Sequence, residues 1–217
     1  MKAGVDAILR RAQAEYLDSL LPESDALLAL MERVAADDGH PIADREVAQL
    51  MRVILATRAP KRILEIGTNI GYSVVVMARA CPDARIETIE IDGATLRSAE
   101  EFARQAGIAD RVTFHHGAAL EVLSRLDGPW DFVFIDCVKT EYSDYLDAVR
   151  DRLVPGAVVF VDNLLWGGQV AEGAKSDDQR ASTDAIRAFN ERFVSDPDFV
   201  ATVVPVGDGV GIAVKRG

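Results

Sequence analysis

The feature that most constrains the fold of this chain is a regular alternation of short β-rich runs with helical stretches. The β-rich runs are residues 62–67, 85–92, 111–117, 131–136 and 157–163, and helical patterns follow at 72–80, 94–105, 119–126, 142–153 and 179–194. Parallel neighbouring strands need a long crossover between them, usually a helix, whereas antiparallel neighbours need only a tight turn. The alternation therefore predicts an α/β chain with a mostly parallel sheet and helices on both faces.

The two ends of the chain extend this pattern. The C-terminal run "FVATVVPVGDGVGIAVKR" (199–216) predicts two strands joined at "VGDGVG", and its last strand should insert antiparallel, which makes a mixed sheet of seven strands. Before the first strand, residues 3–37 have a helical pattern that is interrupted at Pro22, and Arg45 to Ala56 form a second one. Since no linker or repeat divides the 217 residues, we expect one domain over 1–217.

Composition narrows the possible partners. The net charge of −11 disfavours nucleic acid, and the only dense basic segment, "RAPKR" (58–62), is typical of a solvated loop. No apolar run approaches the roughly 20 residues that span a bilayer, and the first residues do not resemble a signal peptide. Two unpaired cysteines, Cys81 and Cys137, indicate a reducing cytoplasm. With only three histidines besides, a zinc site is not expected.

A tight turn follows the first predicted strand, in "EIGTNIGYS" (65–73). Glycines let a ligand approach the backbone, and the helix that follows offers free N–H groups. The spacing of Gly67 and Gly71 is not that of dinucleotide binders, which argues against NAD. Glu90 ends the second strand, where a carboxylate can accept both hydroxyl protons of a ribose. The turn alone is compatible with a purely structural role, but Glu65 and Glu90 favour a nucleoside-type cofactor.

Polar side chains also follow the fourth and fifth strands. Asp136 ends "DFVFID" and Lys139 lies three residues later, while Asp162 and Asn163 end "AVVFVDN". Each group by itself is compatible with a turn or a helix N-cap. Because neighbouring parallel strands end at the same edge of a sheet, we expect Asp136, Asp162 and Asn163 to converge. Their oxygen atoms are hard ligands, which suit Mg²⁺ or Ca²⁺ and leave positions for substrate and water.

Other candidate residues have simpler interpretations. His115 and His116 are expected to end a strand rather than bind a ligand, and Cys137 to be a small packing residue. Tyr142 and Tyr145 are expected to pack a helix rather than bind a substrate ring.

In these segments the sequence resembles the cation-dependent class I O-methyltransferases, a family that includes catechol and caffeoyl-CoA O-methyltransferases and small bacterial relatives. The resemblance covers about residues 40–216 and is carried by "LEIGTNIGYS", "IEID", "FVFIDCVK", "VDNLLWGGQVAE" and "VPVGDGVGIAVKR". It implies a Rossmann-like class I methyltransferase fold with S-adenosylmethionine and Mg²⁺, or another divalent cation such as Ca²⁺ or Mn²⁺. The chain departs from the family at "DCVK", where "DADK" is frequent, and at Ala48, where a glycine is frequent.

The resemblance implies a role for each matching residue. Asp136, Asp162 and Asn163 would bind the metal, Lys139 and Asp136 would be catalytic, and Trp166 with Lys139 would contact the acceptor. The residues implied for the cofactor are Ala43, Glu65, Gly67, Ser73, Glu90, Ala118 and Asp136. Residues 1–57 would cover the acceptor site and 58–217 would form the cofactor-binding core, with a homodimer as the expected assembly.

The predicted reaction is methyl transfer to one hydroxyl of a vicinal dihydroxy aromatic small molecule. A divalent cation bound to both hydroxyl oxygens would lower the pKa of a phenol, which is otherwise near 10, and Lys139 would remove the proton. Two alternatives remain at this stage. One is methylation of a hydroxylated wobble uridine in tRNA, and the other is a non-enzymatic binding protein on the same fold.

Overall fold

Seven strands form one mixed sheet in the order β3-β2-β1-β4-β5-β7-β6. The protein is represented by a computed structural model that describes residues 11–217, so the start of the predicted N-terminal helix, residues 3–10, lies outside the described part. The strand bounds are β1 Arg62–Ile66, β2 Arg85–Glu90, β3 Val112–His116, β4 Trp130–Ile135, β5 Leu153–Val161, β6 Phe199–Val204 and β7 Val210–Lys215. The predicted α/β class, the mixed sheet and the antiparallel last strand are confirmed, since β7 pairs antiparallel with both β5 and β6.

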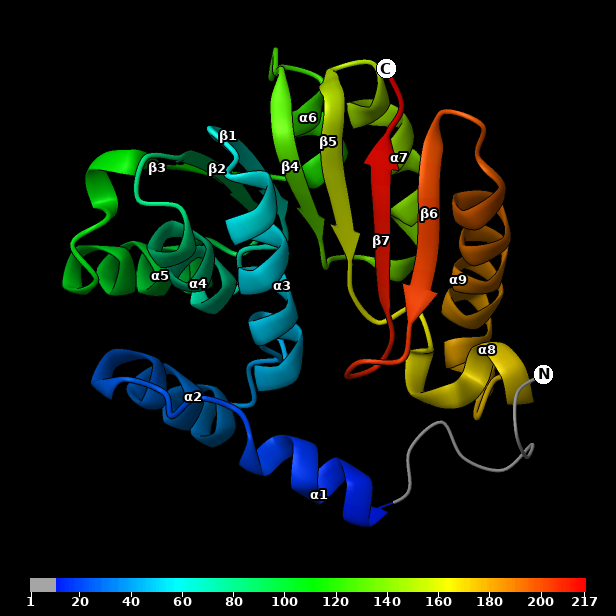
Figure 1. The fold of residues 1–217 in the computed structure, drawn as a ribbon, viewed down its shortest axis with the longest axis horizontal. Coiled ribbons are helices and arrows are strands. Elements are labelled where there is room, and N and C mark those ends of the chain that lie inside the picture. The colour runs from blue at the N-terminus through cyan, green and yellow to red at the C-terminus, as the bar shows by residue number, and fades with distance from the viewer. Residues whose placement is uncertain (1–10) are drawn as a thin grey trace.

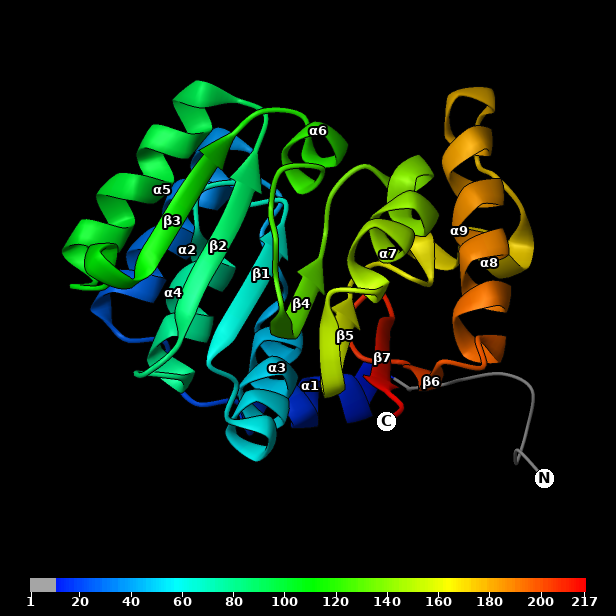
Figure 2. The ribbon, with the colours of Figure 1, turned by 90° about the horizontal axis from the view of Figure 1, so that it is seen from above.

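Helices cover both faces of this sheet (Figures 1 and 2). Their bounds are α1 Arg11–Ser19, α2 Ala26–Asp38, α3 Arg45–Arg58, α4 Tyr72–Ala80, α5 Gly93–Gln105, α6 Ala119–Leu123, α7 Tyr142–Arg150, α8 Gln169–Glu172 and α9 Asp177–Ser195. The predicted interruption at Pro22 is the break between α1 and α2, and Asp25 begins α2 by accepting hydrogen bonds from the N–H groups of Leu27 and Leu28. No helix within residues 11–217 is long and apolar enough to cross a membrane.

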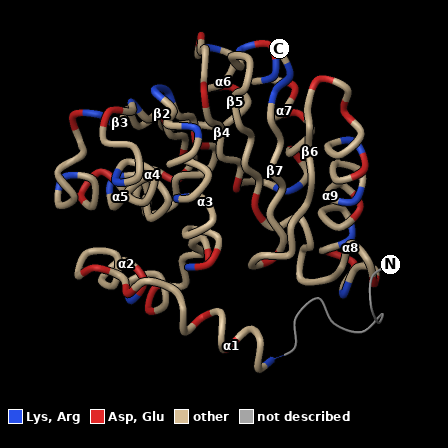
Figure 3. Tube along the Cα trace, viewed as in Figure 1, with Lys and Arg blue, Asp and Glu red and all other residues tan. Residues whose placement is uncertain are grey.

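Alternating side chains of the central strands fill two cores. Phe132, Phe134 and Phe160 pack with α2 to α5 on one face, and Val133 and Ile135 pack with α6, α7 and α9 on the other. This period of two is the reason why the inner strands carry continuous apolar runs: both faces of a covered parallel sheet are dry. Along the surface helix α9, by contrast, acidic and basic residues are interspersed (Figure 3).

Several predicted boundaries were wrong by a few residues. The fifth strand begins at Leu153 rather than 157, because Leu153 pairs with Trp130 across an irregular register despite the Pro155–Gly156 sequence. The same strand ends at Val161, so Asp162 and Asn163 lie just beyond it. The predicted helices 119–126 and 142–153 end earlier, at Leu123 and Arg150.

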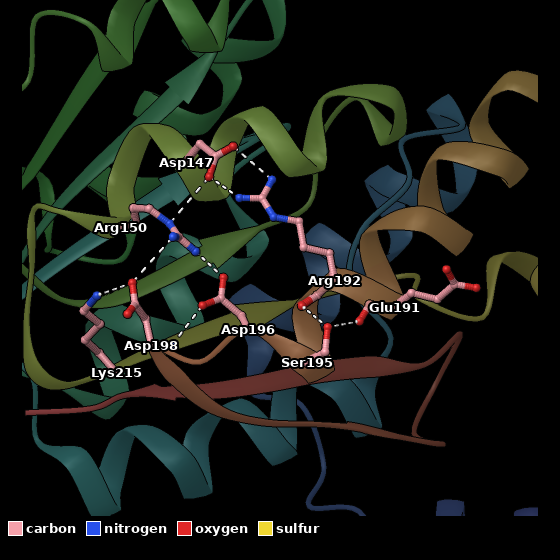
Figure 4. Close-up of polar contacts among 8 residues, drawn as sticks. All are labelled: Asp147, Arg150, Glu191, Arg192, Ser195, Asp196, Asp198 and Lys215. Atoms are coloured by element: carbon pink, nitrogen blue, oxygen red, sulfur yellow. Dashed lines mark hydrogen bonds and ion pairs between the residues drawn. The ribbon is translucent and has the colours of Figure 1, made fainter.

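An ion-pair network joins α7 to the outer edge of the sheet (Figure 4). The Arg150 guanidinium pairs with Asp196, which is buried between α9 and β6, and with Asp147 and Asp198. Lys215 at the end of β7 pairs with Asp198 at 3.3 Å. A buried carboxylate is tolerated when a cation and hydrogen bonds compensate its lost hydration, so this network fixes how the β6–β7 hairpin meets α7.

Truncating Phe160 should destabilise the fold, because its fully buried ring lies 5.8 Å from that of Phe134 and 6.1 Å from that of Phe132, measured between ring centroids. We expect Phe160→Ala to lower the free energy of unfolding by about 3–5 kcal/mol in urea denaturation. The control is Val200→Ala on β6, whose side chain is 57% exposed and should change stability far less. Equal losses in the two variants would contradict this account of the core.

Candidate active site

A cavity of about 710 Å³ opens at the carboxyl ends of β1, β4 and β5, where the strand order reverses direction. Ligands of doubly wound sheets bind at such a position, because the loops on either side separate there. The walls come from the segment before α3, the β1–α4 turn, the end of β2 and the segments after β4 and β5. Of the predicted site residues, those on the wall are Ala43, Gly67, Ser73, Glu90, Asp136, Lys139, Asp162, Asn163 and Trp166.

The β1–α4 turn depends on Gly67. Its φ of +103° is unfavourable for other residues, and a Cβ there would collide with the main-chain oxygen of Asp136. The N–H of Asp136 in turn donates to the main-chain oxygen of Ile66 at 3.0 Å. Gly67 therefore lets the ends of β1 and β4 approach, which places Asp136 beside the cofactor turn.

Glu90 is held by two main-chain N–H groups. Asn69 donates to one carboxylate oxygen and Asp92 to the other, each at 2.9 Å. Asn69 has a φ of +47°, a conformation that asparagine adopts more readily than most residues. Each oxygen keeps a free lone pair, so the carboxylate is oriented and can accept two hydroxyl protons.

Glu65 lies behind the wall rather than on it. Its fully buried carboxylate accepts hydrogen bonds from Ser73 and, at 2.5 Å, from Thr88. Burial raises the pKa of Glu65 to about 8, against the lowering effect of those two hydroxyls. Of these three residues Ser73 reaches the cavity, and its hydrogen bond to Glu65 orients it there.

Lys139 joins the two groups at the ends of β4 and β5. Its Nζ lies 2.7 Å from Asp136 Oδ1, 2.6 Å from Asn163 Oδ1 and 2.7 Å from the hydroxyl of Tyr142. Burial, with the nearby charges of Asp136 and Asp162, raises the pKa of Tyr142 well above its ordinary value. The hydroxyl thus stays protonated, accepts from Lys139 and donates to the main-chain oxygen of Asp162 at 3.1 Å.

Asp162 is almost fully buried beside this group. Burial, followed by the negative charge of Asp136, raises the pKa of Asp162 to about 7, while the N–H of Asn163 and the charge of Lys139 act in the opposite direction. The Asn163 N–H donates to Asp162 Oδ1 at 2.7 Å, and the residue has a φ of +62°. This conformation turns the Asn163 amide oxygen toward Lys139.

The donor atoms fit a hard divalent cation. Asp136 Oδ1 and Asn163 Oδ1 both lie within hydrogen-bond distance of one positively charged atom, the Nζ of Lys139. The raised pKa of the buried Asp162 shows that the charge of its carboxylate is not fully compensated. Oxygen ligands of this kind suit Mg²⁺, Mn²⁺ or Ca²⁺. Within residues 11–217 no group of three or more His, Cys, Asp and Glu is arranged for a metal, since this set has only two carboxylates and an amide.

The segment after Asn163 is hydrogen-bonded to the loop between β6 and β7. Leu164 and Leu165 donate their N–H groups to the main-chain oxygens of Gly209 and Asp208, each at 2.8 Å, and Gly167 donates to Asp208 Oδ1 at 2.7 Å. Trp166 has a φ of +50°, which is uncommon for a bulky residue. Its indole Nε1 is buried and without a hydrogen-bond partner among the described residues, although Trp166 lines the cavity.

Two predicted site residues are not on the cavity wall. Besides Glu65, Ala118 lies outside it, exposed at the N-terminal boundary of α6. Other residues on the cavity wall had no predicted role in the site. Asn69, in the glycine turn, and Asp44, an N-cap residue before α3, carried only weak signals. Cys137 packs partly against the core as predicted and lines the cavity as well. Tyr142 and Tyr145 pack in the core as expected, but the hydroxyl contact of Tyr142 with Lys139 had no signal in the sequence.

Replacing Glu65 with glutamine should flatten the pH dependence of stability. The folded-state pKa is about 8 and the ordinary value is 4.5, so the folded state keeps a proton that the unfolded state releases, and stability falls as the pH rises between these values. Glutamine has no such proton. In urea denaturation at several pH values, the free energy of unfolding should fall less steeply in Glu65→Gln, by about 1.4 kcal/mol per pH unit in mid-range.

Asp162, which titrates near the same range, is present in both proteins and cancels in this comparison. The matched control is Glu191→Gln on the exposed face of α9, which should keep the wild-type slope. A wild-type slope in Glu65→Gln would contradict the raised pKa of Glu65.

Comparison with known proteins identifies the family of this chain. The family model described as O-methyltransferase matches residues 21–216. A caffeoyl-CoA O-methyltransferase of Stellaria longipes is 29% identical over 194 residues, which are 83% of this chain and 80% of that protein. Tricin synthase 1 of Oryza sativa subsp. japonica is 32% identical over 187 residues, 80% of this chain and 74% of that protein.

Solved structures agree with this placement. The O-methyltransferase TomG of Streptomyces achromogenes, which is involved in tomaymycin synthesis and was solved in complex with SAM, superposes with a TM-score of 0.83. It is 33% identical, over 94% of this chain and 95% of that one. The chain therefore belongs to the O-methyltransferase family and is an S-adenosylmethionine-dependent O-methyltransferase of the caffeoyl-CoA type with a class I fold.

Proposed function

We propose that this enzyme methylates one hydroxyl of a vicinal dihydroxy aromatic small molecule with the help of a bound divalent cation. The observation that carries the proposal is the convergence of Asp136 Oδ1 and Asn163 Oδ1 on a single positively charged atom, beside the buried carboxylate of Asp162. The names of two relatives, caffeoyl-CoA O-methyltransferase and tricin synthase, support an aromatic acceptor.

The cofactor end of the cavity is formed by Gly67, Ser73 and Glu90. In this proposal Glu90 accepts the ribose hydroxyl protons, and the glycine turn with Ser73 faces the amino-acid end of S-adenosylmethionine. Glu65 acts through Ser73, since it does not line the cavity. Ala43 contributes a small apolar contact, and the predicted contact of Ala118 with the adenine stays a prediction. When bound, S-adenosylmethionine supplies the methyl group as an electrophilic sulfonium.

Asp136, Asp162 and Asn163 would hold the cation, with Mg²⁺ as the first choice and Mn²⁺ or Ca²⁺ as alternatives. A bound cation of this kind lowers the pKa of an acceptor hydroxyl and fixes a diol in one orientation. The protein's own contribution is the position of Lys139, whose Nζ is held by the hydroxyl of Tyr142 next to this point. A neutral Lys139 amine would accept the hydroxyl proton as the new O–C bond forms and the S–C bond breaks.

The remaining expectations on organisation belong to the same proposal. Residues 1–57 would cover the acceptor and 58–217 would form the cofactor-binding core of a single domain. Ala43 and Asp44 support this division, because both belong to residues 1–57 and line the cavity just before α3. A homodimer and a cytoplasmic location stay predictions.

Removing Asp162 should separate catalysis from cofactor binding. We expect Asp162→Ala to lower Mg²⁺-dependent methyl transfer by about 100-fold or more, because a direct oxygen ligand is lost. Binding of S-adenosylmethionine, measured by calorimetry, should largely survive because the residues proposed to contact the cofactor are unchanged. The matched control, Asp151→Ala at the exposed end of α7, should behave as wild type in both assays.

Two results would contradict the metal assignment: full activity of the wild-type enzyme in EDTA, or unchanged activity of Asp162→Ala. A transfer assay over catechols, caffeoyl esters and tRNA, each with and without Mg²⁺, tests the acceptor class. Transfer to tRNA alone would overturn the small-molecule proposal.

A further inference from the structure

One part of the cavity wall carries more acidic than basic side chains. We define the acceptor end as the part lined by Asp44, Asp162, Asn163 and Trp166. Two carboxylates face this end, and Asp136 lies next to it. The basic side chain on the described wall of the whole cavity is Lys139, whose charge is already shared between Asp136 and Asn163 at 2.7 and 2.6 Å.

Asp44 lies on the cavity wall at the start of α3, and its side chain is exposed. It occupies the N-cap position of α3, where an aspartate normally accepts a hydrogen bond from the first turn, but its side chain makes no such bond. No hydrogen bond or ion pair of its carboxylate occurs within residues 11–217. The neighbouring Arg45 is engaged elsewhere, since its guanidinium donates to the main-chain oxygen of Pro22 at 2.6 Å and lies 4.0 Å from Glu32.

The surroundings of Asp44 are acidic. Partial burial, followed by the charges of Asp208, Asp136 and Asp18, raises the pKa of its carboxyl group. Asp208 is fixed in the hairpin loop by the N–H of Gly167, so its charge stays near this end of the cavity. Asp44 is exposed, so water hydrates its carboxylate, and a positively charged group brought beside it would be attracted both by it and by its acidic neighbours.

Trp166 gives this end an aromatic wall. Its ring lines the cavity, and the Nζ of Lys139 lies 6.0 Å from the ring centroid. An aromatic ring beside carboxylates can contact an ammonium group through its face, so the acceptor end suits a neutral or positively charged acceptor better than an anionic one.

We propose that Asp44 is a specificity-determining residue that selects methyl acceptors without negative charge, favours those with an ammonium group, and disfavours coenzyme A thioesters. The inference rests on the proposed function and names its substrate class. It separates this enzyme from the relatives named caffeoyl-CoA O-methyltransferase, because the phosphate groups of coenzyme A need clustered Lys and Arg side chains. Like charges brought together at a partly desolvated site also repel more strongly than in water.

The test uses three catechols that differ in the charge of one side chain: 2-(3,4-dihydroxyphenyl)ethylamine, 4-ethylcatechol and 3-(3,4-dihydroxyphenyl)propanoate, together with caffeoyl-CoA. For the wild-type enzyme with Mg²⁺, kcat/KM should fall in the order ammonium, neutral, carboxylate, with caffeoyl-CoA last. In Asp44→Asn the ratio of the ammonium to the carboxylate acceptor should fall by about tenfold. In Asp44→Lys the order should invert, and added salt should shrink every difference.

The matched control is Asp151→Asn, which makes the same change in net charge at the opposite end of the sheet and should leave the acceptor ratios at wild-type values. A wild-type preference for caffeoyl-CoA, or acceptor ratios that do not change in Asp44→Asn, would overturn the proposal. So would a loss of Mn²⁺ affinity in Asp44→Asn, measured by titration without acceptor, because Asp44 would then be a cation ligand. The absence of transfer to every catechol is a different result, which rejects the proposed function itself.

Discussion

Two like charges at the ends of neighbouring parallel strands are the constraint on which the site depends. The register of β4 and β5 pairs Ile135 with Val161, so Asp136 and Asp162 follow at the same edge of the sheet. The N–H of Asp162 donates to the main-chain oxygen of Ile135 at 3.1 Å, which fixes that register at its last step. Burial and repulsion from Asp136 then raise the pKa of Asp162 to about 7, and the charged form of Asp162 is favoured again by a nearby positive charge.

Lys139 supplies that charge. Its ammonium contacts Asp136 and the hydroxyl of Tyr142, each three residues away in the chain, and Asn163 from the segment after β5. A bound divalent cation would satisfy the same oxygens more fully and would release Lys139 for work as a base. The same electrostatic demand therefore explains both the contacts of Lys139 and the proposed role of a metal.

Long-range contacts hold the catalytic segment in place. The residues after Asn163 hydrogen-bond to the hairpin loop between β6 and β7, and Asn190 of α9 donates to the main-chain oxygen of Leu164 at 2.7 Å. The outer hairpin is itself fixed to α7 by Arg150 and its carboxylate partners. The hairpin, for which the sequence predicted only two strands with the last one antiparallel, thus positions the acceptor end.

Membership in a family of enzymes decides against the alternative of a non-enzymatic binding protein.

The sequence by itself determined the α/β class with its mostly parallel sheet, the glycine turn after β1 and the polar pair after β5. These features depend on local periodicity and on which residue types follow a strand. It predicted that Asp136, Asp162 and Asn163 converge, since parallel strands end at a common edge, and the structure brings them onto one cavity wall together with Lys139. Strand and helix ends were less accurate, as with β5, because pairing with a neighbour extends a strand beyond its local pattern. Only the tertiary structure decided that Glu65 lies behind Ser73, that Tyr142 contacts Lys139 and that Asp44 faces the acceptor end. Tyr142 and Glu65 meet these partners nearby in the chain, but their directions are fixed by distant groups: Tyr142 donates to the main-chain oxygen of Asp162, and Glu65 accepts from Thr88. No local pattern of residues encodes the direction in which a side chain meets a distant partner.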